Sequence, residues 1–178
     1  SYKAFDTAYS LREKLSSLFN YRHPECISFT RNVTEALNWL IKGNLNPNDH
    51  VIVSHNEHNA VMRPLNQMGI SYSLIPSDGF GYNDYSTLPS LLTPRTKAII
   101  INTPNNPTGC IYGENSLQAI CDAITGKHIF AVCDDVYRQL IYTQDYHSFT
   151  EMAQLKEQII VIQSYSKPYA MTGWRMGY

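Results

Sequence analysis

The chain lacks the features of a membrane-spanning protein and of a nucleic-acid-binding protein. Its apolar runs, such as Ala98–Ile101 and Ile159–Ile162, are far shorter than the roughly 20 residues of a transmembrane helix. Its start shows no charged segment followed by an apolar one, which a signal peptide requires. Lys and Arg total 14 and Asp and Glu total 15, so no positive excess favours nucleic acid or a membrane surface. We therefore expect a cytoplasmic protein that binds neither nucleic acid nor a membrane.

Cysteine is also scarce. The chain has four cysteines, and no pair has the C-x-x-C spacing of redox or metal sites. Cys26 and Cys133 lie in apolar, strand-like runs, where a buried thiol is the usual finding. We therefore expect no disulfide bond.

What the sequence does have is an alternation of short β-rich runs with segments of helical apolar spacing. This pattern is typical of a parallel sheet with helices on both faces. It predicts one three-layer α/β/α domain over residues 1–178, with a seven-stranded, mostly parallel sheet. The predicted strands are Cys26–Thr30, His50–Ser54, Ser71–Pro76, Ala98–Asn102, Phe130–Asp134, Ile159–Ser164 and one that begins near Arg175. The predicted helices are Ala4–Phe19, Val33–Ile41, Asn59–Met68, Tyr85–Leu92, Ser116–Ile124 and a weaker one over Phe149–Leu155.

The segment from Ser164 to Arg175 holds a lysine in a polar turn, with an arginine eight residues later. The amine of Lys167 can condense with an aldehyde, and the planar guanidinium of Arg175 can bind a phosphate through two hydrogen bonds. An aldehyde cofactor that carries a phosphate is pyridoxal phosphate. A lone lysine or arginine is usually solvated surface, so the interpretation depends on two upstream motifs.

These motifs are Pro104-Asn105-Asn106-Pro107-Thr108-Gly109 and Asp134-Asp135-Val136-Tyr137. Asp134 ends an apolar strand at the carboxyl edge of the predicted sheet, where open α/β folds bind ligands. Its carboxylate can hold a pyridine nitrogen protonated, which makes the ring an electron sink. Taken singly, the first motif is also a plain turn, and the acidic pair is also a metal site or a helix cap. Their joint spacing from the lysine favours the cofactor.

With these motifs the second half of the chain resembles the class I and II aminotransferases, which are fold-type I pyridoxal-phosphate enzymes. The resemblance implies that Lys167 holds pyridoxal phosphate as a Schiff base and later moves a proton between the substrate α-carbon and the cofactor. It implies that Tyr137 and Asn106 bind the phenolic oxygen of the cofactor. It also implies that Ser164 and Arg175 bind its phosphate.

The segment Asn32-Val33-Thr34-Glu35 opens a predicted helix directly after a predicted strand. Asn32 is a good N-cap, and Glu35 can complete a capping box. The free amides of the first turn, at Val33 and Thr34, form an anion site together with the Thr34 hydroxyl group. Simple helix capping is the alternative interpretation.

His58 lies in Glu57-His58-Asn59, after the second predicted strand. This segment and the Thr34 turn resemble class V enzymes, the cysteine desulfurase-like branch, whose histidine stacks over the pyridine ring. The resemblance makes His58 a candidate for ring stacking and for carrying protons. A metal pair formed with His55, or a purely structural histidine, are the alternatives.

The two halves therefore resemble different classes. The first hundred residues are similar to class V, whereas the chain from about Ile99 onward is similar to class I and II. A hybrid joined in or near Ala98–Asn102 would explain this, and a single divergent family is the simpler alternative.

The predicted function is amino-group transfer between amino acids and 2-oxo acids, with Lys167, Asp134 and His58 as the catalytic residues. Carbon–sulfur lyase or desulfurase chemistry is an alternative, although none of the four cysteines lies in a motif that matches the mobile nucleophile of the desulfurases. The N-terminal arm, the small domain and the arginine that grips the substrate in the family have no counterpart in residues 1–178. We therefore expect a large domain truncated at both ends, so a cofactor-binding fragment without turnover is a third possibility. The resemblance also implies a homodimer.

Overall fold

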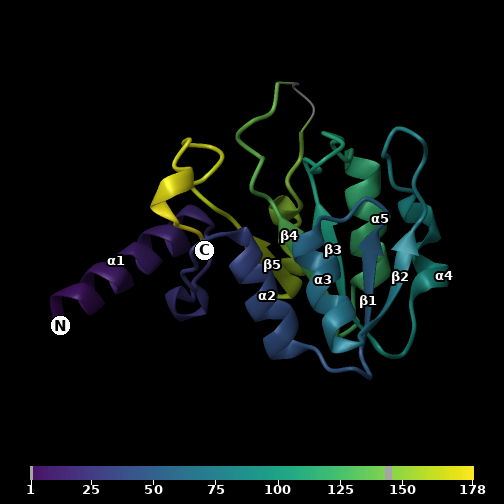
Figure 1. Cartoon of the computed structure of the whole chain (residues 1–178), viewed down its shortest axis with the longest axis horizontal. Coiled ribbons are helices and arrows are strands. Elements are labelled where there is room, and N and C mark those ends of the chain that lie inside the picture. The colour runs from purple at the N-terminus through teal and green to yellow at the C-terminus, as the bar shows by residue number, and fades with distance from the viewer. Residues whose placement is uncertain (1, 143–145) are drawn as a thin grey trace.

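The computed structural model describes residues 2–142 and 146–178, and it has a parallel sheet between two layers of helices (Figure 1). The strands are β1 (His50–Ser54), β2 (Ser71–Ile75), β3 (Thr96–Asn102), β4 (Phe130–Asp134) and β5 (Ile159–Ile162). Their order across the sheet is β2-β1-β3-β4-β5, and every neighbouring pair is parallel. The chain adds β2 on one side of β1 and β3 on the other. This creates the kind of switch point where open α/β sheets bind ligands.

The central strands are apolar because both of their faces are covered. All five residues of β1 are buried, and so are all residues of β3 and β4 except Lys97 and Phe130. The outer strands β2 and β5 are only partly buried. Continuous apolar runs in the centre of a parallel sheet are expected for this arrangement.

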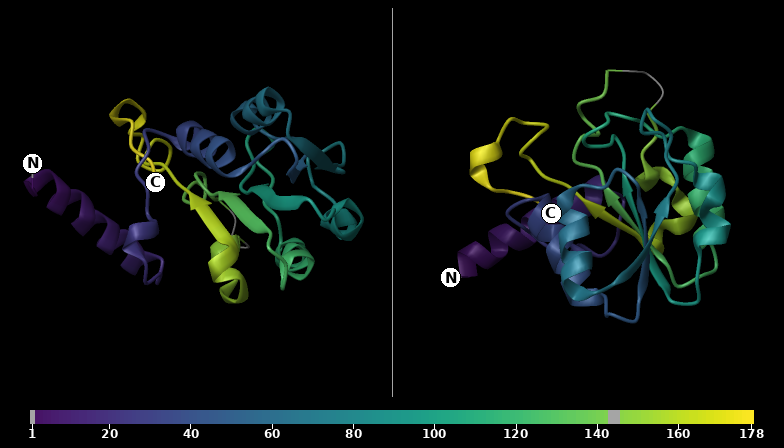
Figure 2. Two further views of the ribbon diagram at one scale, coloured as in Figure 1. Left: turned by 90° about the horizontal axis from the view of Figure 1, so that it is seen from below. Right: turned by 45° about the vertical axis from the view of Figure 1, so that its right-hand side comes forward.

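Two separate apolar cores fix the helices to the sheet. On one face α2 (Val33–Asn44) and α3 (Asn59–Met68) pack Leu37, Ile41 and Leu65 against the strands. On the other face the helical elements are α4 (Leu88–Leu91), α5 (Glu114–Ile124), η2 (Tyr85–Thr87), η3 (Phe149–Glu151) and η4 (Ala153–Gln158). Figure 2 shows the resulting three layers. The predicted three-layer class is therefore present.

The first helix, α1 (Tyr2–Leu18), extends away from the sheet (Figures 1 and 2). Of its residues only Leu15 and Ser16 are buried. It leads into the short 3-10 helix η1 (Pro24–Cys26). Large side chains near its start, Tyr2 and Phe5, are exposed.

The sheet of the described residues has five strands, so the prediction of seven was wrong. The segment predicted as Cys26–Thr30 begins with a 3-10 turn at Pro24, and only Thr30 forms a bridge, with Gly177. The strand predicted near Arg175 is likewise reduced to Gly177, which also bridges to Ser164. A strand exists only where a neighbour accepts and donates hydrogen bonds along several residues. In the first segment only Thr30 does so. Near Arg175, backbone hydrogen bonds link Met176, Gly177 and Tyr178 to Tyr165, Thr30 and Gln163, but only Gly177 forms β-bridges.

Two predicted helices are also wholly or partly 3-10 helix. The predicted helix Tyr85–Leu92 is η2 followed by the four residues of α4, with Pro89 in the first turn. The predicted helix Phe149–Leu155 is η3 and η4, in which Ser148 and Glu151 form a capping box. Cys26, expected to be buried, is exposed, whereas Cys133 is buried as expected. Within the described ranges no helix is long and apolar enough to cross a membrane.

Candidate active site

The loops that follow β3 and β4 lie at the same end of the sheet (Figure 1), and a cavity of about 470 Å³ opens there. Residues from the carboxyl ends of β3 and β4, from the starts of α2 and α3, and from the 164–175 segment line it. All nine residues predicted for the site line this one cavity: Val33, Thr34, His58, Asn106, Asp134, Tyr137, Ser164, Lys167 and Arg175. Segments distant in sequence thus meet at the switch point, as the fold requires of a ligand site.

One end of the cavity is the N-terminus of α2. Asn32 caps the helix, because its Oδ1 accepts a hydrogen bond from the Glu35 amide at 2.9 Å. The predicted capping box does not form. The Glu35 carboxylate instead accepts from the Arg31 amide at 2.7 Å and binds the Arg31 guanidinium at 2.6 Å. Arg31 is thus paired with Glu35 and does not line the cavity. The first turn of α2, at Val33 and Thr34, faces the cavity.

Arg175 reaches the cavity from the other side of this end. Its backbone is left-handed, with φ 58°, and its Nη1 donates to the Thr172 carbonyl oxygen at 2.8 Å. The guanidinium group is exposed. Arg31 makes the largest contribution to lowering the pKa of the Glu35 carboxyl group, and Arg175 lies close enough to add to this effect. A helix N-terminus and a guanidinium group at one end of a cavity suit an anion.

Ser164 follows β5, and its hydroxyl group is largely engaged within the chain. Its Oγ donates to the Met176 carbonyl oxygen at 3.1 Å and accepts from the Ser166 amide at 3.1 Å. These bonds close the turn that carries Lys167. Ser164 therefore shapes this turn as well as lining the cavity.

Lys167 and Tyr137 lie next to each other. The Lys167 Nζ is 5.8 Å from the centroid of the Tyr137 ring, and the lysine side chain is exposed. The Tyr137 ring attracts the ammonium group through its π electrons and holds it over the cavity. Asn106, from the loop after β3, lines the same cavity.

The loop that carries Asn106 is fixed from within. The Oδ1 of Asn105 accepts from the Thr108 hydroxyl group at 2.9 Å, and the Gly109 amide donates to the Asn105 carbonyl oxygen at 2.8 Å. The loop also packs tightly against Gly81, where an added Cβ atom would lie 2.6 Å from the Thr108 side chain. Only glycine fits at residue 81, where φ is +95°.

His58 has a structural contact in addition to its place in the cavity. Its Nδ1 accepts from the Ala60 amide at 3.0 Å and so caps α3. Nδ1 therefore carries no proton in this contact, and a neutral ring holds its proton on Nε2. Among the described residues, no group of three or more His, Cys, Asp or Glu side chains could hold a metal ion.

Asp134 ends β4 at the buried floor of the cavity. Its Oδ1 accepts one weak hydrogen bond, from the Val136 amide at 3.4 Å. Burial, and to a smaller degree the neighbouring Asp135, raises the pKa of Asp134 to about 7, although the Val136 amide lowers it. A carboxyl group with one weak partner, at the end of a buried strand, is available to a cationic group of a ligand.

Asp135 points away from the cavity into a buried polar network. Its Oδ1 accepts from the Tyr146 hydroxyl group at 2.5 Å, and its Oδ2 accepts from the Ser148 hydroxyl group at 3.2 Å. Arg138 lies 3.5 Å from Oδ2, and the Gln163 amide group donates to the Asp135 carbonyl oxygen at 2.7 Å. Burial still raises the pKa of Asp135, although these partners lower it. The two adjacent acids therefore face different surroundings, as neighbours on a strand do.

Sequence analysis did not identify Asn102 as a site residue, and it gave no role to Glu57, which does not line the cavity. Asn102 ends β3, is paired in register with Asp134, and lines the cavity. Its place was visible in the sequence, because it is the polar residue that ends a buried apolar run, as Asp134 is in β4. Glu57 precedes His58 and accepts a hydrogen bond from the Ser54 hydroxyl group at 2.8 Å. Nothing in the sequence indicated that its carboxyl group is shielded.

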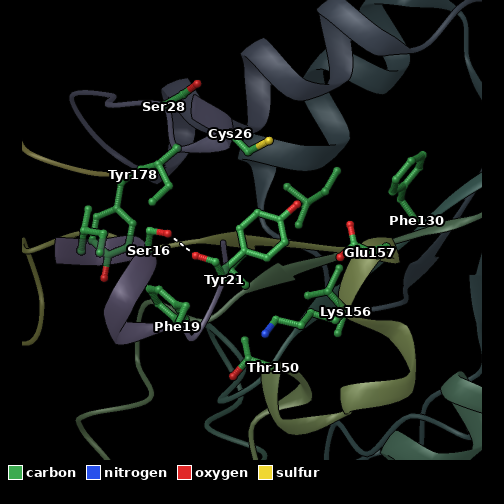
Figure 3. A pocket seen from close by; sticks show the side chains of 15 residues that line it. Ser16, Phe19, Tyr21, Cys26, Ser28, Phe130, Thr150, Lys156, Glu157 and Tyr178 are labelled. Atoms are coloured by element: carbon green, nitrogen blue, oxygen red, sulfur yellow. Dashed lines mark hydrogen bonds between the residues drawn. The ribbon is translucent and has the colours of Figure 1, made fainter. Parts of the chain in front are cut away.

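A second cavity, of about 310 Å³, lies between the end of α1, the segment around Tyr21 and the outer strand β5 (Figure 3). Its walls are mainly apolar. Two of its polar side chains bind backbone carbonyl groups: the Ser16 hydroxyl group binds Tyr21, and the Lys156 ammonium group binds Asn20. None of the nine predicted residues lies in it. The polar cavity at the strand ends is therefore the candidate active site.

Comparison with known proteins identifies one family over the whole chain. The family model described as aminotransferase class I and II matches residues 1–178. The match covers both halves of the sequence, which favours a single family over a hybrid joined near Ala98–Asn102.

Individual relatives agree with the family match. The chain is 31% identical to the aspartate/prephenate aminotransferase of Thermus thermophilus over 94% of the chain and 45% of that protein. It is 29% identical to the methionine aminotransferase of Escherichia coli over 95% of the chain and 45% of that protein. The crystal structure of an aspartate aminotransferase from Thermotoga maritima superposes with a TM-score of 0.86 at 27% identity, covering 95% of the chain and 47% of that structure. The chain thus spans about half the length of these relatives.

Proposed function

This chain belongs to the aminotransferase class I and II family, and we propose on that basis that it is the pyridoxal-phosphate-binding part of an enzyme that transfers amino groups between amino acids and 2-oxo acids. The single observation that carries the proposal is the meeting of all nine predicted residues in one cavity at the strand ends. The family match does not favour the lyase alternative. The desulfurase alternative gains no support either, since three of the four cysteines are buried and the exposed one, Cys26, lines the other cavity.

The residues of the cavity fit the cofactor in charge and in hydrogen bonding. Its anion end, at the start of α2 and at Arg175, suits a phosphate group. The carboxyl group of Asp134 suits a protonated ring nitrogen. The buried Oδ1 of Asn102 has no hydrogen-bond partner within the described part of the chain and lies on the same floor. Bound pyridoxal phosphate supplies an electron-withdrawing ring that stabilises negative charge on the α-carbon of an amino acid.

Each residue has a distinct task in this proposal. Lys167 Nζ would hold the cofactor through its aldehyde, and the free amine would take the proton from the substrate α-carbon. Tyr137 and Asn106 would bind the phenolic oxygen of the cofactor. Asp134 would keep the ring nitrogen protonated, and His58 would stack on the ring.

The interaction of Asp134 with a cation is strong because the carboxyl group is buried. A hydrogen bond to a charged group contributes about 1.5–3 kcal/mol. The bound cation also favours the ionised carboxylate, and so reverses part of the burial effect that raises the pKa of Asp134 to about 7.

We also propose that the protein acts as a homodimer. The aromatic side chains of Tyr2 and Phe5, at the start of α1, are exposed. They support an interaction surface there, because groups of large solvent-exposed apolar side chains often belong to protein–protein interfaces. The cytoplasmic location stays a prediction.

The test is the exchange reaction itself. Purified protein loaded with pyridoxal phosphate is given an amino acid, and both the cofactor absorption spectrum and the matching 2-oxo acid are measured. We expect the spectrum to change and the oxo acid to appear in proportion to bound cofactor. Lys167→Ala should abolish both, whereas Lys97→Ala, which removes an exposed lysine of β3, should leave both unchanged. A spectrum that no amino acid alters would contradict the proposal.

A further inference from the structure

The loops that follow β3 and β4 are not bonded to each other directly. The ladder between the two strands ends at the pair Asn102 and Asp134. Beyond this pair, no hydrogen bond within the described ranges joins residues 103–109 to residues 135–140. These loops carry Asn106 and Tyr137, the two residues that would bind the phenolic oxygen of the cofactor. Their spacing therefore depends on contacts with other segments.

Tyr146 bonds to both loops through its hydroxyl group. This group lies 2.5 Å from the Oδ1 atom of Asp135, the first residue after β4. It also lies 3.2 Å from the carbonyl oxygen of Thr103, the first residue after β3. Asp135 and Thr103 are both buried, so water competes little for these contacts. A single hydroxyl group thus connects the starts of the two loops.

Both anchors of this bridge are fixed by further hydrogen bonds. The Thr103 hydroxyl group accepts from the Tyr112 amide at 3.2 Å. The Asp135 amide donates to the Ile162 carbonyl oxygen at 3.2 Å, and the Gln163 side chain donates to the Asp135 carbonyl oxygen at 2.7 Å. The anchors therefore belong to the ordered backbone of the sheet end, and the bridge joins two firm points.

The path from each anchor to its site residue is short. Asn106 is the third residue after Thr103, and Tyr137 is the second after Asp135. The Arg138 amide donates to the Asp135 carbonyl oxygen at 3.1 Å and closes the turn around Tyr137. The loop around Asn106 is also closed by hydrogen bonds of its own. A closed turn moves with its anchor, so the spacing of the anchors sets the spacing of the two site residues.

The bridge holds in either protonation state of Asp135. A tyrosine hydroxyl group has one proton to donate and can also accept. When Asp135 is ionised, its carboxylate takes most of this proton, and the Thr103 carbonyl oxygen shares it in a three-centre bond. When Asp135 is protonated, it donates to the hydroxyl oxygen, and Tyr146 donates to Thr103 alone. The hydroxyl group contacts both anchors in each case.

We propose that Tyr146 is a positioning residue whose hydroxyl group sets the spacing between the loops 103–109 and 135–140, and thereby between Asn106 and Tyr137. Tyr146 does not line the cavity, so it acts through these two residues. Without the hydroxyl group the loops separate, and the phenolic oxygen of the cofactor loses well-aligned donors. The bridge stands on the contacts alone, whereas its effect on the cofactor rests on the proposed function.

The bridge can be tested without any cofactor, by NMR of the backbone amides. Tyr146→Phe keeps the ring and removes only the hydroxyl group. We expect the signals of both Asn106 and Tyr137 to move in this variant, because both anchors lose the same partner. Asn106 signals that stay in place would overturn the proposal.

The matched control is Ser148→Ala. Ser148 also donates to Asp135, at 3.2 Å, but among the described contacts it has none with Thr103. Both variants remove one hydroxyl group from Asp135, so a general loss of stability affects both. Only Tyr146→Phe should move the Asn106 signals, and an equal movement in Ser148→Ala would contradict the bridge.

A measurement on the parent protein decides the matter if Tyr146→Phe fails to fold. A shielded hydroxyl proton in a short hydrogen bond exchanges slowly and gives its own NMR signal. The signal of Tyr146 should show nuclear Overhauser contacts with protons of both Thr103 and Asp135. Contacts with only one of these residues would overturn the proposal.

Loaded protein tests the positioning role. Hydrogen bonds to the phenolic oxygen of pyridoxal phosphate favour its charged form, so weaker bonds raise the pH midpoint at which the absorption of the bound cofactor changes. In Tyr146→Phe this midpoint should rise by about 0.5 pH unit or more, with unchanged attachment to Lys167. Ser148→Ala should leave it in place. A midpoint that stays the same in Tyr146→Phe would overturn the positioning role.

The two proposals fail in different ways. If the Asn106 and Tyr137 signals move as expected and the protein binds no pyridoxal phosphate, the proposed function fails and the bridge stands. If the cofactor binds on Lys167 and neither the Asn106 signals nor the midpoint change in Tyr146→Phe, the bridge fails and the proposed function stands.

Discussion

At the scale of single residues, the two adjacent acids Asp134 and Asp135 show how position decides chemistry. The side chain of Asp134 has one weak hydrogen bond and faces the cavity, whereas that of Asp135 is tied to Tyr146 and Ser148. The alternation of side chains along an extended chain explains why only one of them faces the cavity. Tyr146 and Ser148, the partners of Asp135, could not be predicted, because they lie more than ten positions away in the chain.

This difference yields a prediction about binding and stability. Asp134→Ala should weaken pyridoxal-phosphate binding by roughly 10-fold to 100-fold, since a charge-assisted hydrogen bond is lost. Asp135→Ala should instead lower the free energy of unfolding by about 1–3 kcal/mol, because Tyr146 and Ser148 lose a buried acceptor. Cofactor titration and urea unfolding of both variants measure the two effects. Equal losses of affinity would mean that the pair acts together.

The raised pKa values of Asp134 and Glu57 predict how stability depends on pH. Both are raised to about 7, so the folded, cofactor-free protein binds more protons than the unfolded chain above about pH 4. The free energy of unfolding should therefore fall as the pH rises from about 5 to about 8. Asp134→Asn should reduce this slope and add roughly 2–4 kcal/mol near pH 8. Urea unfolding at both pH values is the measurement, and an unchanged slope would show that Asp134 is ionised at little cost.

At the scale of elements, the sequence predicts the parts that have a strong periodic or capping signal. β1, β4 and α3 have the predicted bounds, and β3 is two residues longer at its start. The predictions failed for segments whose secondary structure depends on strand pairing or on packing against other elements. Residues 26–30 have strand-like composition, yet only Thr30 has a partner. Composition cannot indicate whether a neighbouring strand is present.

His58 combines an element-level role with a site role, and two substitutions can separate them. His58→Asn keeps a side-chain acceptor for the cap of α3 but removes the ring, so stability should be retained and cofactor affinity should fall modestly. His58→Phe keeps a ring but loses the cap, which should lower the free energy of unfolding by about 0.5–2 kcal/mol. Stacking contributes about 0.5–1.5 kcal/mol to binding. If both variants bind cofactor as the parent does, His58 serves α3 alone.

Gly177 forms β-bridges with Thr30 and Ser164. The space around its Cα atom is too small for a side chain. An added Cβ atom would lie 2.9 Å from the Gln163 carbonyl oxygen and 3.0 Å from the Thr30 hydroxyl oxygen. Gly177→Ala should therefore lower the free energy of unfolding by about 1–3 kcal/mol. Gly173→Ala is the matched control, because its Cβ atom would meet nothing within 4 Å. Urea unfolding compares the two, and equal stability would contradict the close packing.

At the scale of the whole molecule, the site depends on the sheet order. The order β2-β1-β3-β4-β5 brings the ends of β3 and β4 beside the starts of α2 and α3. The motifs predicted which residues meet, because the family spacing of Lys167, Asp134 and Asn106 is visible in the sequence. The buried contacts of Tyr112 with Asn83 and Tyr85 were not visible in the sequence, since they join segments that are distant in the chain.

The central claim is that this cavity holds pyridoxal phosphate on Lys167, and one measurement tests it most directly. Protein incubated with pyridoxal phosphate is reduced with borohydride and digested, and the modified peptide is identified by mass spectrometry. We expect the adduct on Lys167, the lysine whose Nζ lies over the Tyr137 ring and which lines the cavity together with Asp134 and Arg175. An adduct on Lys127 or Lys97, with Lys167 unmodified, would contradict the claim.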